Sequence, residues 1–345
     1  MEGLRGLAIL LVVASHAGVL LQGGLGNAIF FPLSGFFAAA PFRDEGVEQR
    51  FLSPKGIGES YLARLVRILP VYWLTILMVH LVNGNWTWHE VIKNALFLDV
   101  EGHFWFLQQE MFFSLCLPLI MAVLWGCRRL ARRACLSEHL TCAVVVLVLA
   151  LISKRFLTAE VFSLRGNNQA QVVRFFQFLP GMATAYVYKS IRAYQKRRPL
   201  PGLVLGLCSV YPLAFLAFCI CSSQQVLQLF WPEMVFLVGW SWPSLCSWLT
   251  CLCVLSLLLA GQSPSAKAYS SLLLRGIGKI SFPLYVIHWF LIGTCPYEQQ
   301  PARLTAVLTM SAGAALLAHL LVEKPANLWW HSKKWSAVRD YFQTL

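Results

Sequence analysis

Long apolar runs alternate with short polar loops along the whole of this 345-residue chain. Most runs have roughly 15 to 22 residues, close to the length that an α-helix needs to cross a bilayer. They predict ten helices, over residues 4–21, 27–41, 69–82, 104–125, 139–153, 171–189, 201–221, 244–260, 279–294 and 302–322. We therefore expect an all-α integral membrane protein, a bundle of about ten transmembrane helices in which residues 1–345 form a single domain.

One apolar stretch does not fit this count. Residues 229–243 read LFWPEMVFLVGWSWP and are interrupted by Pro232, Gly239 and Pro243. Proline and glycine break a membrane helix unless neighbouring groups satisfy the freed backbone. The stretch is therefore interpreted as an eleventh span, a re-entrant piece or the bent start of the helix over 244–260.

The composition supports a membrane location. Hydrophobic residues make up 58% of the chain and charged residues 12%, which is about half the ~25% charged residues of soluble domains. The formal net charge of +13 could suggest nucleic-acid binding. However, the basic residues cluster in short loops between the apolar runs, as in the cytoplasmic loops of membrane proteins. A lipid bilayer is therefore expected as a partner, and nucleic acid is not.

The charges of the loops predict an orientation. Basic residues dominate 42–68, 126–138, 190–199, 262–278 and the tail after Lys324. The loops 83–103 and 295–301 are neutral or acidic, and the mildly basic loop 154–170 does not fit the alternation. With ten helices the strongly basic segments fall on one side together with both termini. We therefore expect cytoplasmic N- and C-termini in a plasma (inner) membrane or a secretory-pathway membrane.

The 11 cysteines show no CxxC spacing and no zinc-like pattern. Cys219 and Cys221, like Cys251 and Cys253, lie inside apolar runs, where a thiol usually acts as a small hydrophobic group. Neither a disulfide framework nor a metal site is predicted.

The first apolar run, EGLRGLAILLVVASHAG, contains two residues that are costly in hydrocarbon, Arg5 and His16. Eleven steps of 100° return to within about 20° of the starting direction after a rise of ~16 Å, so the two side chains share one helix face. A coenzyme A thioester would suit such a pair, because arginine binds phosphates and imidazole transfers protons near neutral pH. The alternatives are a packing role for His16 with Arg5 as a helix anchor, or a secretory signal peptide.

Several segments resemble one known family. GLRGLAILLVVASH is similar to the opening of the acyltransferase-3 family of integral membrane acyl-CoA-dependent O-acyltransferases, which is marked by Arg, ten residues and His. Later motifs of the family resemble, in the same order, FFPLSGFF (30–37), YLARLVRILPVYW (61–73), GHFWFLQQEMFFSLCLPL (102–119), ISFPLYVIHWF (280–290) and LLVEKP (320–325). Each segment alone is weak, but the ordered set covers almost the whole chain. The resemblance is to the stand-alone form, without a fused extracellular domain.

The resemblance implies a membrane O-acyltransferase that moves an acyl group, most simply acetyl, from cytoplasmic acyl-CoA to a hydroxyl of a carbohydrate or lipid-linked acceptor. In this interpretation His16 is the base or a transient acyl carrier. Glu110, a carboxylate in a nearly uncharged helix, orients or charge-stabilises His16. Acyl-CoA is a co-substrate, and no permanently bound cofactor or metal is expected.

The remaining roles follow from the same resemblance. The donor phosphates are assigned to Arg5, Arg64 and Arg67, of which the last two share a helix face because they are three residues apart. Candidate contacts to the acceptor are Ser34, His103, Trp105, Tyr285 and His288. Gly35 is interpreted as a site of close helix packing. Glu323 is interpreted as a structural residue.

Each role has a structural alternative. Glu110 could pair with another buried donor, the arginines could be ordinary loop cations, and Tyr285 and His288 could be core residues. The chain also departs from the family pattern, with Ala28 where Asp is frequent and Met111 where a second Glu is frequent. The competing functional class is a transporter or lipid-handling membrane protein, for which broken apolar segments are typical. The lack of repeat symmetry and the combination of Arg, His and Glu favour the enzyme.

Overall fold

The computed structural model describes residues 1–19, 24–42, 45–83, 86–98, 100, 102–156, 173–222, 229–230, 234–296 and 301–332. Within these ranges the chain is helical and contains no strand, which confirms the all-α prediction. Each of the ten predicted runs corresponds to a helix. These are α1 (Glu2–His16), α2 (Gly24–Ala39), α4 (Pro54–Asn83), α6 (Trp105–Arg133), α7 (Glu138–Phe156), α8 (Phe175–Gln195), α9 (Gly202–Cys221), α11 (Met234–Leu259), α14 (Ser281–Thr294) and α15 (Ala302–Ala318).

Shorter helices that the hydropathy pattern does not predict lie between the long ones. They are α3 (Glu45–Leu52), α5 (Trp88–Ala95), the 3-10 turn η1 (Gly102–Phe104), α12 (Pro264–Tyr269), α13 (Leu272–Lys279), the π-helical segment η3 (His319–Glu323) and α16 (Lys324–Ser332). Polar side chains cap the N-termini of several of these helices. Thr87 and Glu90 form a capping box on α5, and the Ser263 hydroxyl accepts a hydrogen bond from the Ala266 backbone N–H at the start of α12.

Ten membrane crossings are not confirmed. In the described part of the chain, five helical stretches are long and apolar enough to cross a membrane: Pro54–Val82, Gly102–Arg133, Glu138–Phe156, Gly202–Cys221 and Ala302–Trp330. A sixth is added if α13 and α14, bent by 73° relative to each other, form one span. Hydropathy registers an apolar run whether protein or lipid surrounds it, so the pattern alone does not fix the number of crossings.

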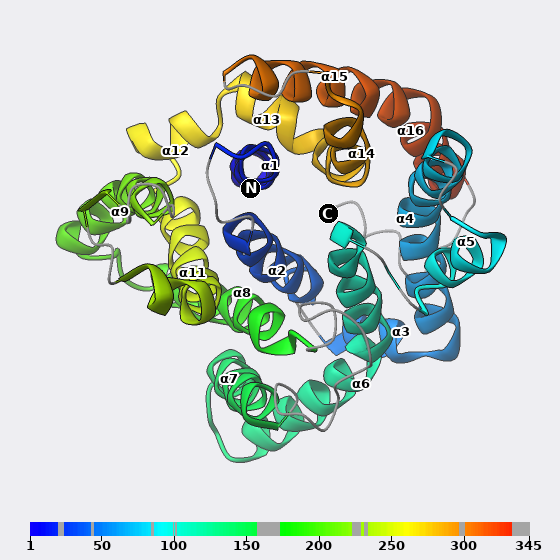
Figure 1. Ribbon diagram of the computed structural model, residues 1–345. Helices are drawn as coiled ribbons and strands as arrows, with labels where there is room; N and C mark the ends of the chain where they lie inside the picture. The colour runs from blue at the N-terminus through cyan, green and yellow to red at the C-terminus, as the bar shows by residue number, and fades with distance from the viewer. Residues whose placement is uncertain are drawn as a thin grey trace.

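The two N-terminal helices illustrate this difference. α1 has 15 residues and α2 has 16, so at about 1.5 Å per residue they are ~22–24 Å long. A hydrocarbon core is ~30 Å thick. Most of their residues are buried, and both helices lie inside a ring formed by the others (Figure 1). Neighbouring helices therefore take the place of lipid around them.

The interrupted stretch 229–243 is not a separate span in the part of it that the structure describes. α11 runs without a break from Met234 to Leu259. Of the three interpretations offered by the sequence, the structure supports the start of the following helix.

Glycine allows α2 to approach α8 closely. Gly35 faces the backbone carbonyl of Phe178, and Gly181 faces that of Pro32, at separations where an added Cβ would overlap the carbonyl oxygen. The packing interpretation of Gly35 is therefore confirmed. α2 also packs against α11, while α1 packs against α13, α2 and α14.

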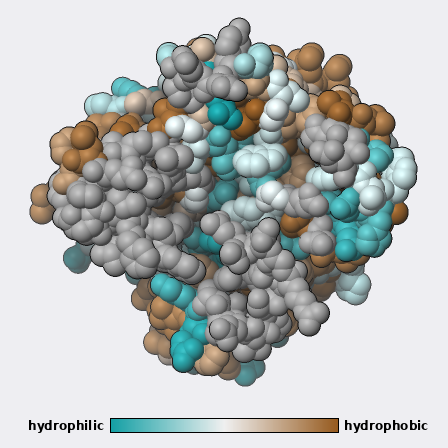
Figure 2. Space-filling model, viewed as in Figure 1, coloured by the Kyte–Doolittle hydropathy of each residue, from teal (hydrophilic) through white to brown (hydrophobic). Residues whose placement is uncertain are grey.

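Basic segments meet at one end of the bundle. Arg128 of α6 donates to Glu48 of α3 at 2.5 Å and pairs with Glu138 of α7 at 3.2 Å. Lys189 of α8 donates to the Ala39 carbonyl oxygen at the end of α2 at 2.7 Å. The Arg128 contacts join the basic segments 42–68 and 126–138, and Lys189 lies directly before the basic segment 190–199. Hydrophilic residues also gather toward the middle of the face shown in Figure 2, with hydrophobic residues along much of its rim.

Candidate active site

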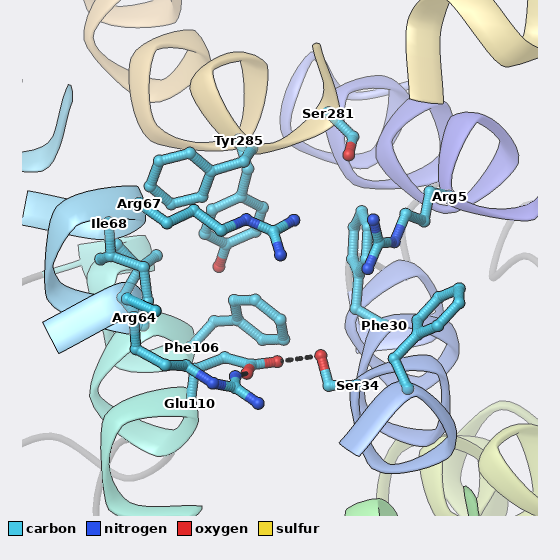
Figure 3. Close-up of a pocket in the computed structure, with 14 residues that line it drawn as sticks. Arg5, Phe30, Ser34, Arg64, Arg67, Ile68, Phe106, Glu110, Ser281 and Tyr285 are labelled. Atoms are coloured by element: carbon cyan, nitrogen blue, oxygen red, sulfur yellow. Dashed lines mark hydrogen bonds and ion pairs between the residues drawn. The ribbon is translucent and has the colours of Figure 1, made fainter. Parts of the chain in front are cut away.

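A cavity lies between α1, α2, α4, α6 and α14 (Figure 3). Its empty volume, which includes the space open to solvent, is about 840 Å³. Its polar lining consists of Arg5, Ser34, Arg64, Arg67, Glu110, Ser281 and Tyr285. The structure thus brings together all three arginines assigned to the donor, with three other predicted site residues.

The arginines reach the cavity from two helices. Arg64 and Arg67 share a face of α4, and Arg67 and Arg5 extend toward each other from opposite walls (Figure 3). Arg64 has an acidic partner, because its Nη1 lies 3.5 Å from Oε2 of Glu110. Within the described residues neither Arg5 nor Arg67 forms an ion pair, and the Arg5 guanidinium lies 4.6 Å from the ring centroid of Phe37. Three cations and one carboxylate leave a formal positive charge that favours an anionic ligand.

The contacts of Glu110 correct its predicted role. Its carboxylate accepts a hydrogen bond from the Ser34 hydroxyl at 2.5 Å and faces Arg64. The side chain hydrogen-bonded to His16 is His288, not Glu110. Glu110 lies at the level of Arg5, and His16 is about 16 Å further along α1. Glu110 is therefore part of the arginine cavity. The prediction that its carboxylate orients His16 through a direct contact was wrong.

Three imidazoles, those of His16, His103 and His288, form what we call the histidine cluster. Nδ1 of His16 and Nε2 of His288 are 2.8 Å apart, and their ring planes differ by 4°. The ring centroid of His103 lies 5.3 Å from that of His288. Trp289 meets the His16 ring edge-on at a centroid distance of 4.9 Å. Residues that are far apart in the sequence therefore share one small volume.

Tyr285 connects the cavity with the histidine cluster. It lines the cavity, and its hydroxyl donates to the His103 carbonyl oxygen at 2.7 Å. Its ring centroid lies 5.8 Å from that of His288. The rings of Phe30 and Phe106 pack against it. These three rings form the side of the cavity next to the cluster, and His16 itself lies outside the cavity lining.

The parallel course of α1 and α14 explains why the cavity and the histidine cluster lie at different positions along these helices. Arg5 shares the cavity with Ser281, at the start of α14, and His16 contacts His288, seven positions later. The two helices therefore run side by side in the same direction. α1 is one helix from Glu2 to His16, so Arg5 and His16, eleven residues apart, lie on the same face of it, as the helical period predicts.

Trp105 does not take the place predicted for it. The Trp105 ring lies against Phe31, and the Arg174 guanidinium is 4.8 Å from its centroid. Trp105 therefore belongs neither to the cavity nor to the cluster. Trp289, which was not predicted as a site residue, packs against His16 and His103 of the histidine cluster. The signal in the sequence was its position directly after His288. Glu323 pairs with His319 at 2.7 Å, in agreement with a structural role.

The donor atoms present do not suggest a metal centre. In the part of the chain that the structure describes, no group of three or more His, Cys, Asp or Glu side chains could hold a metal ion. The imidazoles of the cluster instead face one another, carbonyl oxygens and aromatic rings.

Comparison with known families gives a match over most of the chain. The model of the acyltransferase-3 family, described as an acyltransferase domain, matches residues 1–322 of the 345. No curated protein and no solved structure matches the chain.

Proposed function

The chain belongs to the acyltransferase-3 family, and on that premise we propose that it moves an acyl group, most simply acetyl, from cytoplasmic acyl-CoA to a hydroxyl of a carbohydrate or lipid-linked acceptor. Family membership and the apolar helices together make the protein a membrane acyltransferase. The observation that carries the finer assignment is the arginine cavity next to the histidine cluster.

The charge of the cavity supports acyl-CoA as the donor. Acyl-CoA has phosphates at one end and a thioester at the other, joined by a long uncharged arm. Guanidinium groups bind phosphates through two parallel hydrogen bonds, and Arg5 and Arg67 have no acidic partner among the described residues. The aromatic and aliphatic remainder of the lining suits the arm and the acyl group.

The chemistry that we propose uses the lone pair of the His16 imidazole. As general base, His16 takes the proton of the acceptor hydroxyl while its oxygen bonds to the acyl carbon and the carbon–sulfur bond breaks. The imidazolium then returns the proton to the coenzyme A thiolate, so that His16 ends neutral. In the alternative, the imidazole first accepts the acyl group and passes it to the hydroxyl in a second step.

An unsatisfied nitrogen in the cluster supports a hydroxyl acceptor. Nε2 of His103 lies 3.0 Å from the Val286 carbonyl oxygen, so this nitrogen carries a hydrogen. Nδ1 of the neutral ring then has a lone pair, and this buried atom has no partner among the described residues. Buried polar atoms are almost always hydrogen-bonded. A substrate hydroxyl would satisfy this one.

The first test compares wild type, His16→Ala and His89→Ala, purified in detergent and shown to be folded. Acetyl-CoA turnover is measured by thiol release, and transfer of labelled acetyl to a lipid and glycan extract is measured in parallel. We expect His16→Ala to lose about 10²–10⁴-fold in turnover, as for removal of a general base, and to keep acetyl-CoA binding. His89, exposed on α5, serves as the histidine control and should change nothing.

Two results would contradict the proposal. Equal turnover by wild type and His16→Ala would remove His16 from the chemistry. No turnover by the wild type, across several acyl donors and acceptors, would argue against acyl transfer and favour a transport function.

A further inference from the structure

We propose that His288 is a positioning residue that sets the tautomer of His16, so that Nδ1 of His16 carries the hydrogen and Nε2 carries the reactive lone pair. The inference rests on the proposed function and deepens it, because it specifies which nitrogen of His16 acts. It follows from the hydrogen bonds around His288.

The hydrogen of His288 is located by two carbonyl groups. Its ring is fully buried, and Nδ1 lies 2.7 Å from the carbonyl oxygen of Tyr285 and 3.1 Å from that of Leu284. A carbonyl oxygen only accepts hydrogen bonds, so Nδ1 of His288 must be the donor. In a neutral imidazole the other nitrogen, Nε2, then has a lone pair.

This lone pair determines the state of His16. Nε2 of His288 is 2.8 Å from Nδ1 of His16. Two lone pairs repel, so Nδ1 of His16 must supply the hydrogen, which leaves its Nε2 unprotonated. The small angle of 4° between the rings, with centroids 5.1 Å apart, fits two rings joined edge to edge by this bond.

A protonated His288 would reverse the assignment but is disfavoured. It would place a cation in a fully buried site, and burying an unpaired charge costs much free energy. Within the described residues no carboxylate is hydrogen-bonded to His288; its partners are His16 and the carbonyl groups of Tyr285 and Leu284.

The same chain of bonds stabilises His16 during the reaction. When Nε2 of His16 takes the hydroxyl proton, Nδ1–H continues to donate to His288 and spreads the positive charge. His288 keeps its own hydrogen on the backbone carbonyls, and the proton leaves again from Nε2 of His16 to the thiolate. A carboxylate supplies this support in serine-hydrolase triads. Here a neutral imidazole and two carbonyl groups supply it, so no additional charge has to be buried.

Two substitutions separate positioning from packing. In His288→Gln the amide oxygen of the new side chain can accept a hydrogen bond near the position of Nε2, whereas the shorter side chain in His288→Asn reaches only to the position of Nδ1. We expect His288→Asn to lower kcat for acetyl-CoA turnover roughly 10–100-fold, as when the group that orients a functional histidine is removed. KM for acetyl-CoA should not change, and His288→Gln should recover most of the loss.

Wild-type kcat in His288→Asn would overturn the proposal. An equal loss in His288→Gln and His288→Asn would also overturn it, because the site would then need the imidazole for its shape alone.

A measurement that does not depend on activity observes the tautomer directly. In protein labelled with ¹⁵N-histidine, NMR distinguishes protonated from unprotonated ring nitrogens, and comparison with His16→Gln assigns the His16 signals. We expect a protonated Nδ1 and an unprotonated Nε2 in wild type, and a mixture of tautomers in His288→Asn. A protonated Nε2 in wild type would overturn the inference. The expected tautomer in a protein that turns over no acyl-CoA would instead contradict the proposed function and leave the tautomer assignment intact.

Discussion

The three arginines of the cavity have different surroundings. Arg64 lies 3.5 Å from Glu110, which also holds Ser34, so part of its hydrogen-bonding capacity is already used. Arg5 packs over the ring of Phe37. Arg67 extends into the cavity from the opposite wall (Figure 3). Arg5 and Arg67 are therefore the residues with the most capacity left for a phosphate.

Arg67→Gln is expected to raise KM for acetyl-CoA about ten-fold or more. Hydrogen bonds to charged groups contribute ~1.5–3 kcal/mol, and about 1.4 kcal/mol corresponds to a factor of ten in binding. Because Arg67 lies apart from the histidine cluster, kcat should change little. Steady-state kinetics over a range of acetyl-CoA concentrations measures both constants.

Arg129→Gln provides the matched control. Arg129 lies outside the cavity and pairs with Glu45 at 3.0 Å, so its loss should leave KM unchanged. Similar KM values for wild type and Arg67→Gln would exclude Arg67 from donor binding.

At the level of the helices, the contact between α2 and α8 holds one wall of the cavity. Ser34 and Phe37 line the cavity from α2, and Gly35 between them turns toward the backbone of α8. Small residues at such crossings allow the main chains to approach closely, which is a common way to pack helices in membranes. The position of Ser34 thus depends on a glycine that has no chemical role.

Gly35→Ala should destabilise the protein by ~1–3 kcal/mol, the usual cost of overpacking. The added methyl group would overlap the Phe178 carbonyl oxygen and push α2 from α8. Thermal unfolding in detergent, followed by tryptophan fluorescence, measures the effect. Gly206→Ala in α9 is the control, because open space surrounds Gly206 and alanine favours a helix by ~0.8–1.0 kcal/mol over glycine. Equal melting temperatures for wild type and Gly35→Ala would show that the close contact between α2 and α8 does not contribute to stability.

On the scale of the whole molecule, ion pairs connect the basic segments to the ends of helices. Arg275 pairs with Glu2 at 3.4 Å where α13 meets the start of α1. Arg132 of α6 pairs with Glu45 of α3 at 2.8 Å. These pairs involve the basic segments 42–68, 126–138 and 262–278. We propose that these segments face the cytoplasm, in keeping with the positive-inside rule.

Cys135 allows this orientation to be tested without introducing a new cysteine. It is exposed in the turn between α6 and α7, inside the basic segment 126–138. A membrane-impermeant maleimide should modify it in sealed vesicles whose cytoplasmic face is outward, and leave it intact in vesicles of the opposite orientation. Cys135→Ser identifies the signal among the other cysteines. Labelling with the opposite sidedness would place the basic segments, and with them the donor cavity, outside the cytoplasm.

What the sequence determined by itself is local along the chain. Hydropathy located the ten long helices found in the described residues. The 3.6-residue period placed Arg5 and His16 on one face because both lie in a single helix. The ordered motifs identified the family that the comparison confirmed. Short helices such as α5 and α13 were missed, because they begin at caps within polar loops and lack a long apolar run.

The tertiary structure alone decided which of these residues meet. His16 is bonded to His288, which is 272 positions away, and Glu110 is bonded to Ser34 and Arg64 rather than to His16. These pairings depend on the axial position and the rotation of each helix relative to its neighbours. The periodicity within one helix does not contain that information. Burial likewise depends on the surroundings, since an apolar helix such as α1 has the same hydropathy inside a ring of helices as it would have in lipid. For this reason the sequence could name the groups of the site, and only the packed helices assign each group its partner.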